Sequence, residues 1–260
     1  MRLFLILLIG LVSLTACSND PNDSFIKSTE ETHLLLAATS SMSHVLPDVI
    51  EAFEEENPYI TITVDYGPSG ELAQQIQQGA PVDLFISGNQ EWMDMLADQS
   101  MIVADSRTNF ATNQLVFAGT AGEDVSISSL EALQQGTFDK IVLGQPETSP
   151  VGTYAKQALQ SANLWEPLSD SFLYAKDLAQ VVTFIESGKV DAGFVYYSDV
   201  IETDRVEMIF PVDSELHNPI EFPAAITTIS TNHADSDRFI TYLKSDEAAT
   251  ILEEHGFNRE

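Results

Sequence analysis

Strand-like and helix-like segments alternate along residues 34–257, and this alternation constrains the fold more than any other feature of the sequence. Short apolar or β-branched runs, such as Ile60 to Val64 and Asp83 to Ser87, are typical of strands. Between them, apolar residues recur at helical spacing, as in Tyr154 to Ala162. We therefore expect an α/β class with a largely parallel sheet. The units are too many for one small sheet, and 260 residues are enough for two lobes.

The first unit joins the apolar run Leu34 to Ala38 to the hydroxyl-rich turn Thr39 to Ser41, followed by a helical pattern. The first turn of a helix has unpaired N–H groups and the positive end of the dipole, so such a turn can hold an anion. Ser and Thr at this place can equally be ordinary helix caps. Similar turns lie at residues 68–70 and 148–153. Because ligands bind beyond the carboxyl ends of strands in open α/β sheets, these turns of neutral donors can converge on one anion.

The N-terminal segment, residues 1–17, has the pattern of a signal peptide. Arg2 supplies the positive start, and the apolar core that follows is too short to span a bilayer as a mature helix. The segment ends in Leu14-Thr15-Ala16-Cys17, which resembles the lipobox of bacterial lipoproteins, where the cysteine is lipidated and becomes the mature N-terminus. Cys17 is the only cysteine, so it cannot form an internal disulfide. A cleaved soluble signal peptide is the alternative.

Charge and composition restrict the partners of the protein. Residues 18–33 are polar and are expected to form a flexible tether. The formal net charge of -29, from 40 acidic and 11 basic residues, argues against nucleic acid and anionic membrane surfaces as partners. The simplest interpretation of this charge is a solvated acidic surface.

Sequence patterns of catalysis and of metal binding are absent. The turn at residues 67–70 lacks the glycine that an esterase nucleophile elbow needs after the serine. No two of the five histidines have the helical i, i+4 spacing of a zinc protease. Asp65, Asp83 and Asp199 stand at strand ends, where acidic residues cap helices more often than they catalyse. We therefore predict that the protein is not an enzyme and carries no cofactor.

Several segments follow one another in the order of a known family. They are Thr39-Ser40-Ser41, Ser69 to Ile76, Gly79 to Ser87, Gln90 to Met93, Pro150 to Lys156, Asp191 to Asp199, Tyr242 to Lys244 and His255-Gly256-Phe257. Together they resemble the molybdate-binding proteins of bacterial ABC importers. The resemblance implies a two-lobed periplasmic-binding-protein-like fold of type II, with the ligand cleft between α/β lobes joined by two hinge crossings. Lobe one would comprise residues 34–113 plus 200–257, and lobe two residues 114–199.

The resemblance also implies which residues hold the anion. By position, Ser41 and Ser69 of lobe one would donate from their hydroxyls and backbone N–H groups. Val151 and Leu178 of lobe two would donate from backbone N–H groups alone, and Tyr196 would donate its phenol. These groups would bind molybdate as an oxyanion, without direct protein ligands to the metal.

The first turn departs from the family pattern in two ways. Ser40 precedes Ser41, so Ser40 can share or replace its role. Pro47 falls early in the first helix, where a proline beyond the first turn would remove a hydrogen bond. The helix therefore begins later than in relatives or is kinked near the site.

The resulting prediction is a monomeric receptor, anchored through Cys17 on the extracytoplasmic face of the cell membrane. It would capture molybdate or tungstate and deliver it to an ABC permease and, indirectly, to its ATPase. Hydrogen phosphate carries a proton and needs an acceptor, so a site of donors alone should reject it. The alternatives are a receptor for sulfate or another tetrahedral oxyanion, a hydrolase that uses Asp65 or Asp83, and a signalling or adhesion lipoprotein.

Overall fold

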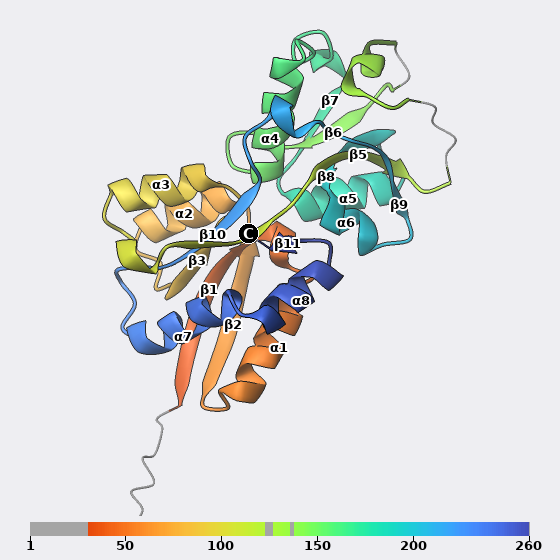
Figure 1. Ribbon diagram of the computed structural model, residues 1–260. Helices are drawn as coiled ribbons and strands as arrows, with labels where there is room; N and C mark the ends of the chain where they lie inside the picture. Colours follow the sequence, from red (N-terminus) through yellow and green to blue (C-terminus); the bar gives the residue numbers. More distant parts are fainter. Residues whose placement is uncertain (1–30, 123–126, 136–137, 260) are drawn as a thin grey trace, which may run out of the picture. The chain divides into compact units, whose positions relative to one another are not determined.

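The computed structural model describes residues 31–122, 127–135 and 138–259, so the predicted signal peptide, Cys17 and most of the predicted tether lie outside the described residues. The described chain forms two β-sheets with helices packed against them (Figure 1). This arrangement confirms the α/β class. Within the same ranges, no helix combines the length and the apolar character needed to cross a bilayer.

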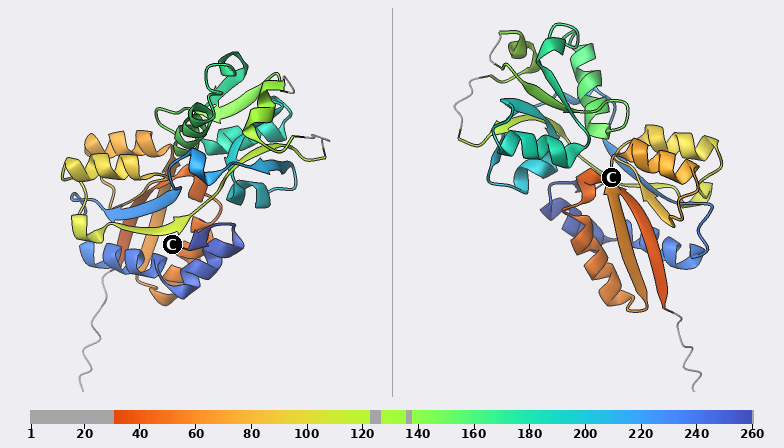
Figure 2. Two further views of the ribbon diagram at one scale, coloured as in Figure 1. Left: turned by 45° about the horizontal axis from the view of Figure 1, so that its top comes forward. Right: turned by 180° about the vertical axis from the view of Figure 1, so that it is seen from behind.

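The six-stranded sheet has the strand order β11-β4-β10-β3-β1-β2. Its strands are β1 (Thr32–Thr39), β2 (Ile60–Gly67), β3 (Leu84–Ile86), β4 (Thr108–Thr112), β10 (Glu221–Ile226) and β11 (Asn258–Arg259). The accompanying helices are α1 (Leu46–Glu56), α2 (Ser69–Gln77), α3 (Gln90–Asp98), α7 (His233–Leu243) and α8 (Asp246–Glu254), with short 3-10 turns at η1 (Ser40–Met42) and η2 (Ala104–Ser106). Figure 2 shows α2 and α3 on one face of this sheet and α1, α7 and α8 on the other.

Alternating side chains of the six-stranded sheet build its two apolar layers. Ala37 of β1 and Phe85 of β3 pack with the apolar residues of α2 and α3. Their neighbours Leu36 and Ile86 belong to the other layer, which also holds Phe53 of α1. This alternation is the period-2 pattern of a sheet that is covered on both faces.

The five-stranded sheet has the order β7-β6-β8-β5-β9. Its strands are β5 (Leu115–Thr120), β6 (Ile141–Gly144), β7 (Phe172–Ala175), β8 (Ala192–Tyr196) and β9 (Val206–Pro211). Its helices are α4 (Pro150–Ser161), α5 (Leu178–Glu186) and α6 (Tyr197–Ile201), with 3-10 turns η3 (Leu130–Gln135), η4 (Ser169–Ser171) and η5 (Ser214–Leu216). The core centres on Phe117, whose ring lies 5.0 Å from that of Phe194 and 5.2 Å from that of Phe210.

Both sheets are mixed, so the expectation of a largely parallel sheet is wrong. Strand β1 pairs in parallel with β2 and β3, and β6 with β7 and β8. Strands β4, β5, β9, β10 and β11 all pair antiparallel. The antiparallel strands include the neighbours β4 and β5, which no helix separates, so strand–helix alternation could not reveal them.

The chain passes between the sheets twice, at residues 113–114 and at residues 212–220. The second crossing corrects one predicted boundary, because residues 200–257 were assigned to lobe one. Strand β9 (Val206–Pro211) pairs with β5 in the five-stranded sheet. An apolar strand pattern shows that a segment is a strand but does not show which sheet offers it a hydrogen-bonding edge.

The start of α1 shows where Pro47 lies in the helix. The turn after β1 is the 3-10 turn η1 (Ser40–Met42), and α1 begins only at Leu46. Pro47 is thus the second residue of the helix, where its missing N–H would have had no partner within the helix. The proline lies within the first turn and therefore removes no hydrogen bond of the helix.

Candidate functional site

A small cavity lies where the ends of β1 and β8 meet the first turns of α4 and α5. It is lined by Thr39, Ser40, Ser41, Pro68, Ser149, Pro150, Val151, Asp177, Leu178 and Tyr196. The volume open to the centre of a water-sized sphere is about 10 Å³. This is about the smallest volume that admits one water molecule, so a tetrahedral anion fits only when the lining moves apart.

The structure brings most of the predicted anion contacts to this cavity. Ser41, Val151, Leu178 and Tyr196 line it, and so does Ser40. Ser69 does not line it, although the adjacent Pro68 does. The buried Ser69 hydroxyl accepts a hydrogen bond from the backbone N–H of Gly88 at 3.0 Å. An oxygen that accepts in this way keeps its own hydrogen available for another acceptor.

Two helix starts point their first turns at the cavity. The sequence predicted a turn over residues 148–153, but α4 begins within it at Pro150, the residue type that most readily occupies a first helical position. Val151 therefore lies in the first turn of α4, as Leu178 does in α5. First-turn N–H groups have no acceptor within the helix and carry the positive end of the dipole. The cavity thus offers partial positive charge from neutral groups.

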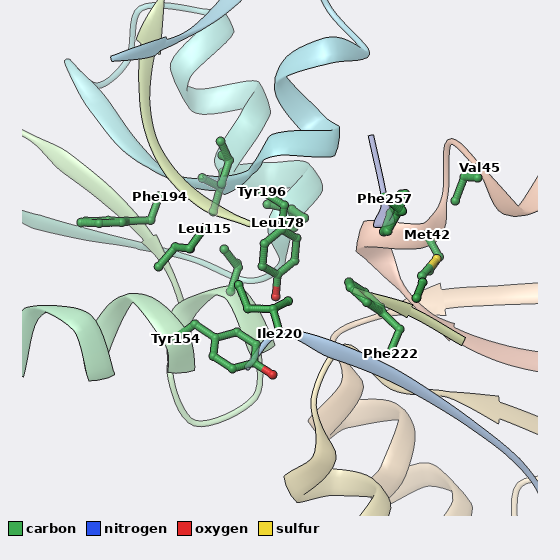
Figure 3. Packing of buried hydrophobic residues seen from close by; sticks show 14 of the residues in the cluster. Met42, Val45, Leu115, Tyr154, Leu178, Phe194, Tyr196, Ile220, Phe222 and Phe257 are labelled. Atoms are coloured by element: carbon green, nitrogen blue, oxygen red, sulfur yellow. The ribbon is translucent and has the colours of Figure 1, made fainter. Parts of the chain in front are cut away.

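Tyr196 places a hydroxyl at the end of β8. Its side chain is 1% exposed, and its Oη is buried and has no hydrogen-bond partner among the described residues. The ring lies edge-on to Phe222, with 6.0 Å between centroids (Figure 3). Burial, with Tyr154 and Asp199 nearby, raises the pKa of the phenol well above 10, so the hydroxyl stays protonated at neutral pH. A buried donor without an acceptor costs about 1–3 kcal/mol, which a bound acceptor would offset.

Asp199 holds the backbone at Tyr196. Its Oδ2 accepts a hydrogen bond from the Tyr196 N–H at 3.0 Å, at the start of α6. Burial raises the pKa of this carboxyl to about 7, although hydrogen bonds from the backbone oppose the increase. Asp199 thus serves as a helix cap, as strand-end aspartates commonly do.

The lining contains one carboxylate and, among the residues described, no lysine, arginine or histidine. That carboxylate belongs to Asp177, so the expectation of neutral donors alone needs correction. Asp177 Oδ1 accepts a hydrogen bond from the Gln180 N–H at 2.9 Å and caps α5. The sequence shows a good helix cap here, but only the fold shows that this cap borders the cavity.

The other aspartates considered for catalysis lie elsewhere. Asp65 is exposed on β2. Asp83 accepts hydrogen bonds from Ser230 Oγ at 2.6 Å and from the Leu35 N–H at 2.9 Å. Neither residue lines the cavity. Across the described ranges, no group of three His, Cys, Asp or Glu side chains is placed to hold a metal ion.

Contacts beside the cavity join the parts of the chain built on the two sheets. The Gly70 N–H donates to the Thr148 carbonyl at 3.0 Å. Gly88 lies so close to Pro150 that a Cβ on Gly88 would stand 2.9 Å from Pro150 Cγ. Both halves of the lining are therefore held together around the cavity.

The family model of bacterial extracellular solute-binding proteins matches residues 34–258. The chain belongs to this family. Among curated relatives, it is 32% identical over 258 residues to the "Putative ABC transporter substrate-binding lipoprotein YvgL" of Bacillus subtilis, covering 99% of this chain and 98% of the relative. It is also 32% identical over 236 residues to the molybdate-binding protein ModA of Escherichia coli, covering 88% and 90%.

Solved structures of solute-binding proteins share the fold. The periplasmic molybdate-binding protein of Azotobacter vinelandii aligns with a TM-score of 0.79 at 21% identity, over 86% of this chain and 98% of that one. The sulfate-binding protein SubI of Mycobacterium tuberculosis aligns with a TM-score of 0.75 at 16% identity, over 87% and 86%. At these identities the likeness shows the fold alone, and the predicted periplasmic-binding-protein-like fold is confirmed.

The residues that sequence reasoning missed are Thr39, Pro68, Ser149, Pro150 and Asp177. The turns containing Thr39 and Ser149 were recognised as hydroxyl-rich, so a signal for these two was present. The resemblance directed attention to one residue of each turn and left its neighbours out.

Proposed function

We propose that this solute-binding protein captures molybdate or tungstate as an oxyanion and delivers it to an ABC permease. The single observation that carries the proposal concerns Tyr196, which lines the small cavity and whose buried hydroxyl has no hydrogen-bond partner among the described residues. Helix N-termini and serine hydroxyls surround the same cavity. A deprotonated tetrahedral oxyanion accepts hydrogen bonds on every side and needs no donor of its own, so it suits this set.

The proposed contacts are the hydroxyls of Ser41, Ser69 and Tyr196 and the backbone N–H groups of Val151 and Leu178. Ser40 is the alternative to Ser41 in the first turn. Ser41 Oγ lies 3.3 Å from Thr39 Oγ1, which orients it, whereas Ser40 also borders a larger neighbouring hollow near His44. We therefore assign the contact to Ser41.

The energetics favour binding by many weak donors instead of one cation. A hydrogen bond to a charged group contributes about 1.5–3 kcal/mol, so several of them can offset desolvation of the anion. The donors come from both sheets, and each half of the lining alone would present only part of the set. Closure of the two halves around the anion would assemble the site.

The relatives support the choice of anion and of partner. The Escherichia coli relative is a molybdate-binding protein, and the Bacillus subtilis relative bears the name of an ABC transporter lipoprotein. By this analogy we propose a permease and its ATPase as partners and a lipid anchor at Cys17, and we keep the expectation of a monomeric receptor as a proposal. In cells that express the Cys17→Ser variant, the protein should no longer incorporate radiolabelled palmitate. The variant protein should also be absent from the membrane fraction.

Sulfate is the second candidate. The cavity is small, which favours the smaller of the two tetrahedral anions. Sulfate, like molybdate, is fully deprotonated at neutral pH and needs donors only. The Asp177 carboxylate does not change this choice, because it is engaged in capping α5.

Isothermal titration calorimetry of the purified protein tests the proposal with molybdate, tungstate, sulfate and phosphate. We expect the tightest binding for molybdate and tungstate and no measurable binding of phosphate. Tight sulfate binding with weak molybdate binding would establish the second candidate. Tight phosphate binding, or no binding of any of these anions, would refute a site of donors for a deprotonated oxyanion.

A further inference from the structure

Ser149 occupies a helix-capping position but does not cap. It precedes α4 with extended backbone angles (φ -102°, ψ 120°), as an N-cap residue does, yet its side chain makes no cap hydrogen bond. Ser245 holds the same position before α8, and its Oγ accepts from the Ala248 N–H at 3.1 Å. The same residue type therefore has different roles at the starts of the two helices, and of these two serines only Ser149 lines the cavity.

The backbone N–H and C=O groups of Ser149 are both hydrogen-bonded, whereas its hydroxyl makes no helix-cap hydrogen bond. The Ser149 N–H donates to the Gln145 carbonyl at 2.8 Å, and its own carbonyl accepts from the Thr153 N–H at 3.0 Å. The residue is 2% exposed. A serine held in this way presents its hydroxyl from a rigid frame, with little conformational entropy left to lose on binding.

Gly144, the last residue of β6, makes the room for this side chain. A Cβ at Gly144 would stand 2.6 Å from Ser149 Oγ and 2.9 Å from Val151 Cγ1. A glycine here thus allows β6 to pass close behind the start of α4. Ser149 lines the cavity together with Val151, which lies two residues further along at the same helix start.

We propose that the Ser149 hydroxyl is a further donor to the bound oxyanion, beyond the contacts assigned above. This inference rests on the proposed function. It gives the five-stranded part a second side-chain hydroxyl beside that of Tyr196, so that the helix start at α4 contributes a hydroxyl as well as its N–H groups. The cap of α4 is left unmade because the ligand, not the helix, uses the hydroxyl.

The test compares Ser149→Ala with Ser245→Ala by calorimetry and thermal unfolding. For Ser149→Ala we expect molybdate binding about 10- to 100-fold weaker, the loss of one hydrogen bond to a charged group. The Tm of the ligand-free protein should stay near the wild-type value, and the Tm increase caused by molybdate should shrink. For Ser245→Ala we expect the reverse: a Tm lower by about 2–4 °C, from the lost cap, and unchanged affinity.

A second control is Ser236→Ala in α7, which removes a fully buried hydroxyl that has no partner among the described residues and does not line the cavity. Its affinity should equal that of the wild type.

If the wild type binds molybdate and Ser149→Ala binds it equally well, the inference is overturned while the proposed function stands. If Ser149→Ala lowers the ligand-free Tm as Ser245→Ala does and keeps its affinity, Ser149 is a cap. If the wild type binds no oxyanion, the proposed function itself fails.

Discussion

Two junctions join the parts of the chain built on the two sheets, and they use polar groups in opposite ways. At the cavity, the Tyr196 hydroxyl and the first-turn N–H groups are neutral, and the hydroxyl has no partner in the described part of the chain. At the other junction, His255 bonds through Nδ1 to Glu202, which follows α6, and through Nε2 to Asp48 of α1 at 3.0 Å. The first junction leaves polar groups that the proposed anion would use, whereas the second pairs its charged groups with one another.

The comparison shows how each junction responds to its surroundings. The pKa of the Tyr196 phenol is raised, so this neutral donor stays protonated across the physiological pH range. The affinity of the cavity for an anion should therefore not depend on the protonation state of this group. The pKa of His255, which lies between two carboxylates, is raised above 6.5, so this junction should respond to pH. The following changes should affect one junction and leave the other as it is.

The largest effect is expected for Tyr196→Phe. Removing the unpartnered donor should weaken molybdate binding by about 1.5–3 kcal/mol, roughly 10- to 150-fold. The ligand-free protein should be as stable as the wild type or more so, because a buried unsatisfied group is removed. Calorimetry and urea unfolding measure the two quantities. Unchanged affinity would show that the phenol does not contact the anion.

Gly88→Ala should separate the halves of the cavity. The added Cβ would stand 2.9 Å from Pro150 Cγ and 3.0 Å from Thr39 Oγ1, so one side of the site must move. Such overpacking costs about 1–3 kcal/mol, and we expect most of it to appear as lost molybdate affinity. Gly79→Ala is the control, since a Cβ there meets nothing within 4 Å. Its strained positive φ should lower stability and spare affinity. Equal affinity losses in both variants would contradict this view.

Ser69→Ala should weaken molybdate by about 1.5 kcal/mol, the lower end for a charged hydrogen bond. The hydroxyl also accepts from the Gly88 N–H, so the variant should lose some stability as well. Calorimetry with thermal unfolding separates the two effects. A loss of stability without a loss of affinity would place Ser69 behind the site as a support.

The smallest effect concerns the pH dependence at His255. Burial lowers the pKa of His255, but the hydrogen bonds that its ring donates to the carboxylates of Glu202 and Asp48 outweigh burial and raise the pKa above 6.5. A raised pKa of the folded state stabilises the protein below pH 6.5, and the stabilisation is lost as the pH rises through the folded-state pKa. We expect His255→Gln to lower the free energy of unfolding by up to about 1 kcal/mol at pH 6 and by almost nothing at pH 9.

Urea unfolding of His255→Gln between pH 5 and 9 measures this difference. Asp199 also titrates near neutrality, because its folded-state pKa of about 7 lies above the usual 3.8. Its raised pKa costs stability as the pH rises from about 4 to 7, so the Asp199→Asn background isolates the histidine. A stability difference that does not change with pH would show that His255 is not charged in the folded state.

Part of the cavity lining was predictable because local motifs carry it. The hydroxyl turn at Ser41 and the strand end at Tyr196 are each visible in a few residues. Val151 and Leu178 were predicted from the family resemblance alone, because the sequence pattern places both helix starts a few residues later than the structure does.

The rest depends on geometry that no local pattern records. Whether a serine at a helix start bonds to the helix, as Ser245 does, or leaves its hydroxyl free, as Ser149 does, is decided by neighbours distant in sequence. The pairing of β9 with β5 and the mixed sheets depend on which edges are free when strands meet. Likewise, an aspartate such as Asp177 is a residue type that commonly caps helices, but only the packing of α5 shows that it lies beside the cavity.

The order of the strands along the chain has a consequence for how an exported chain acquires its structure. The five-stranded sheet uses the consecutive strands β5 to β9, whereas the six-stranded sheet joins β1 to β4 with β10 and β11 from the end of the chain. Pairing between distant segments is slow, because a long loop must be closed first. We expect the five-stranded sheet to form first after translocation. Until residues 221–226 arrive, β3 keeps an open edge, so the six-stranded sheet is completed late in the emergence of the chain.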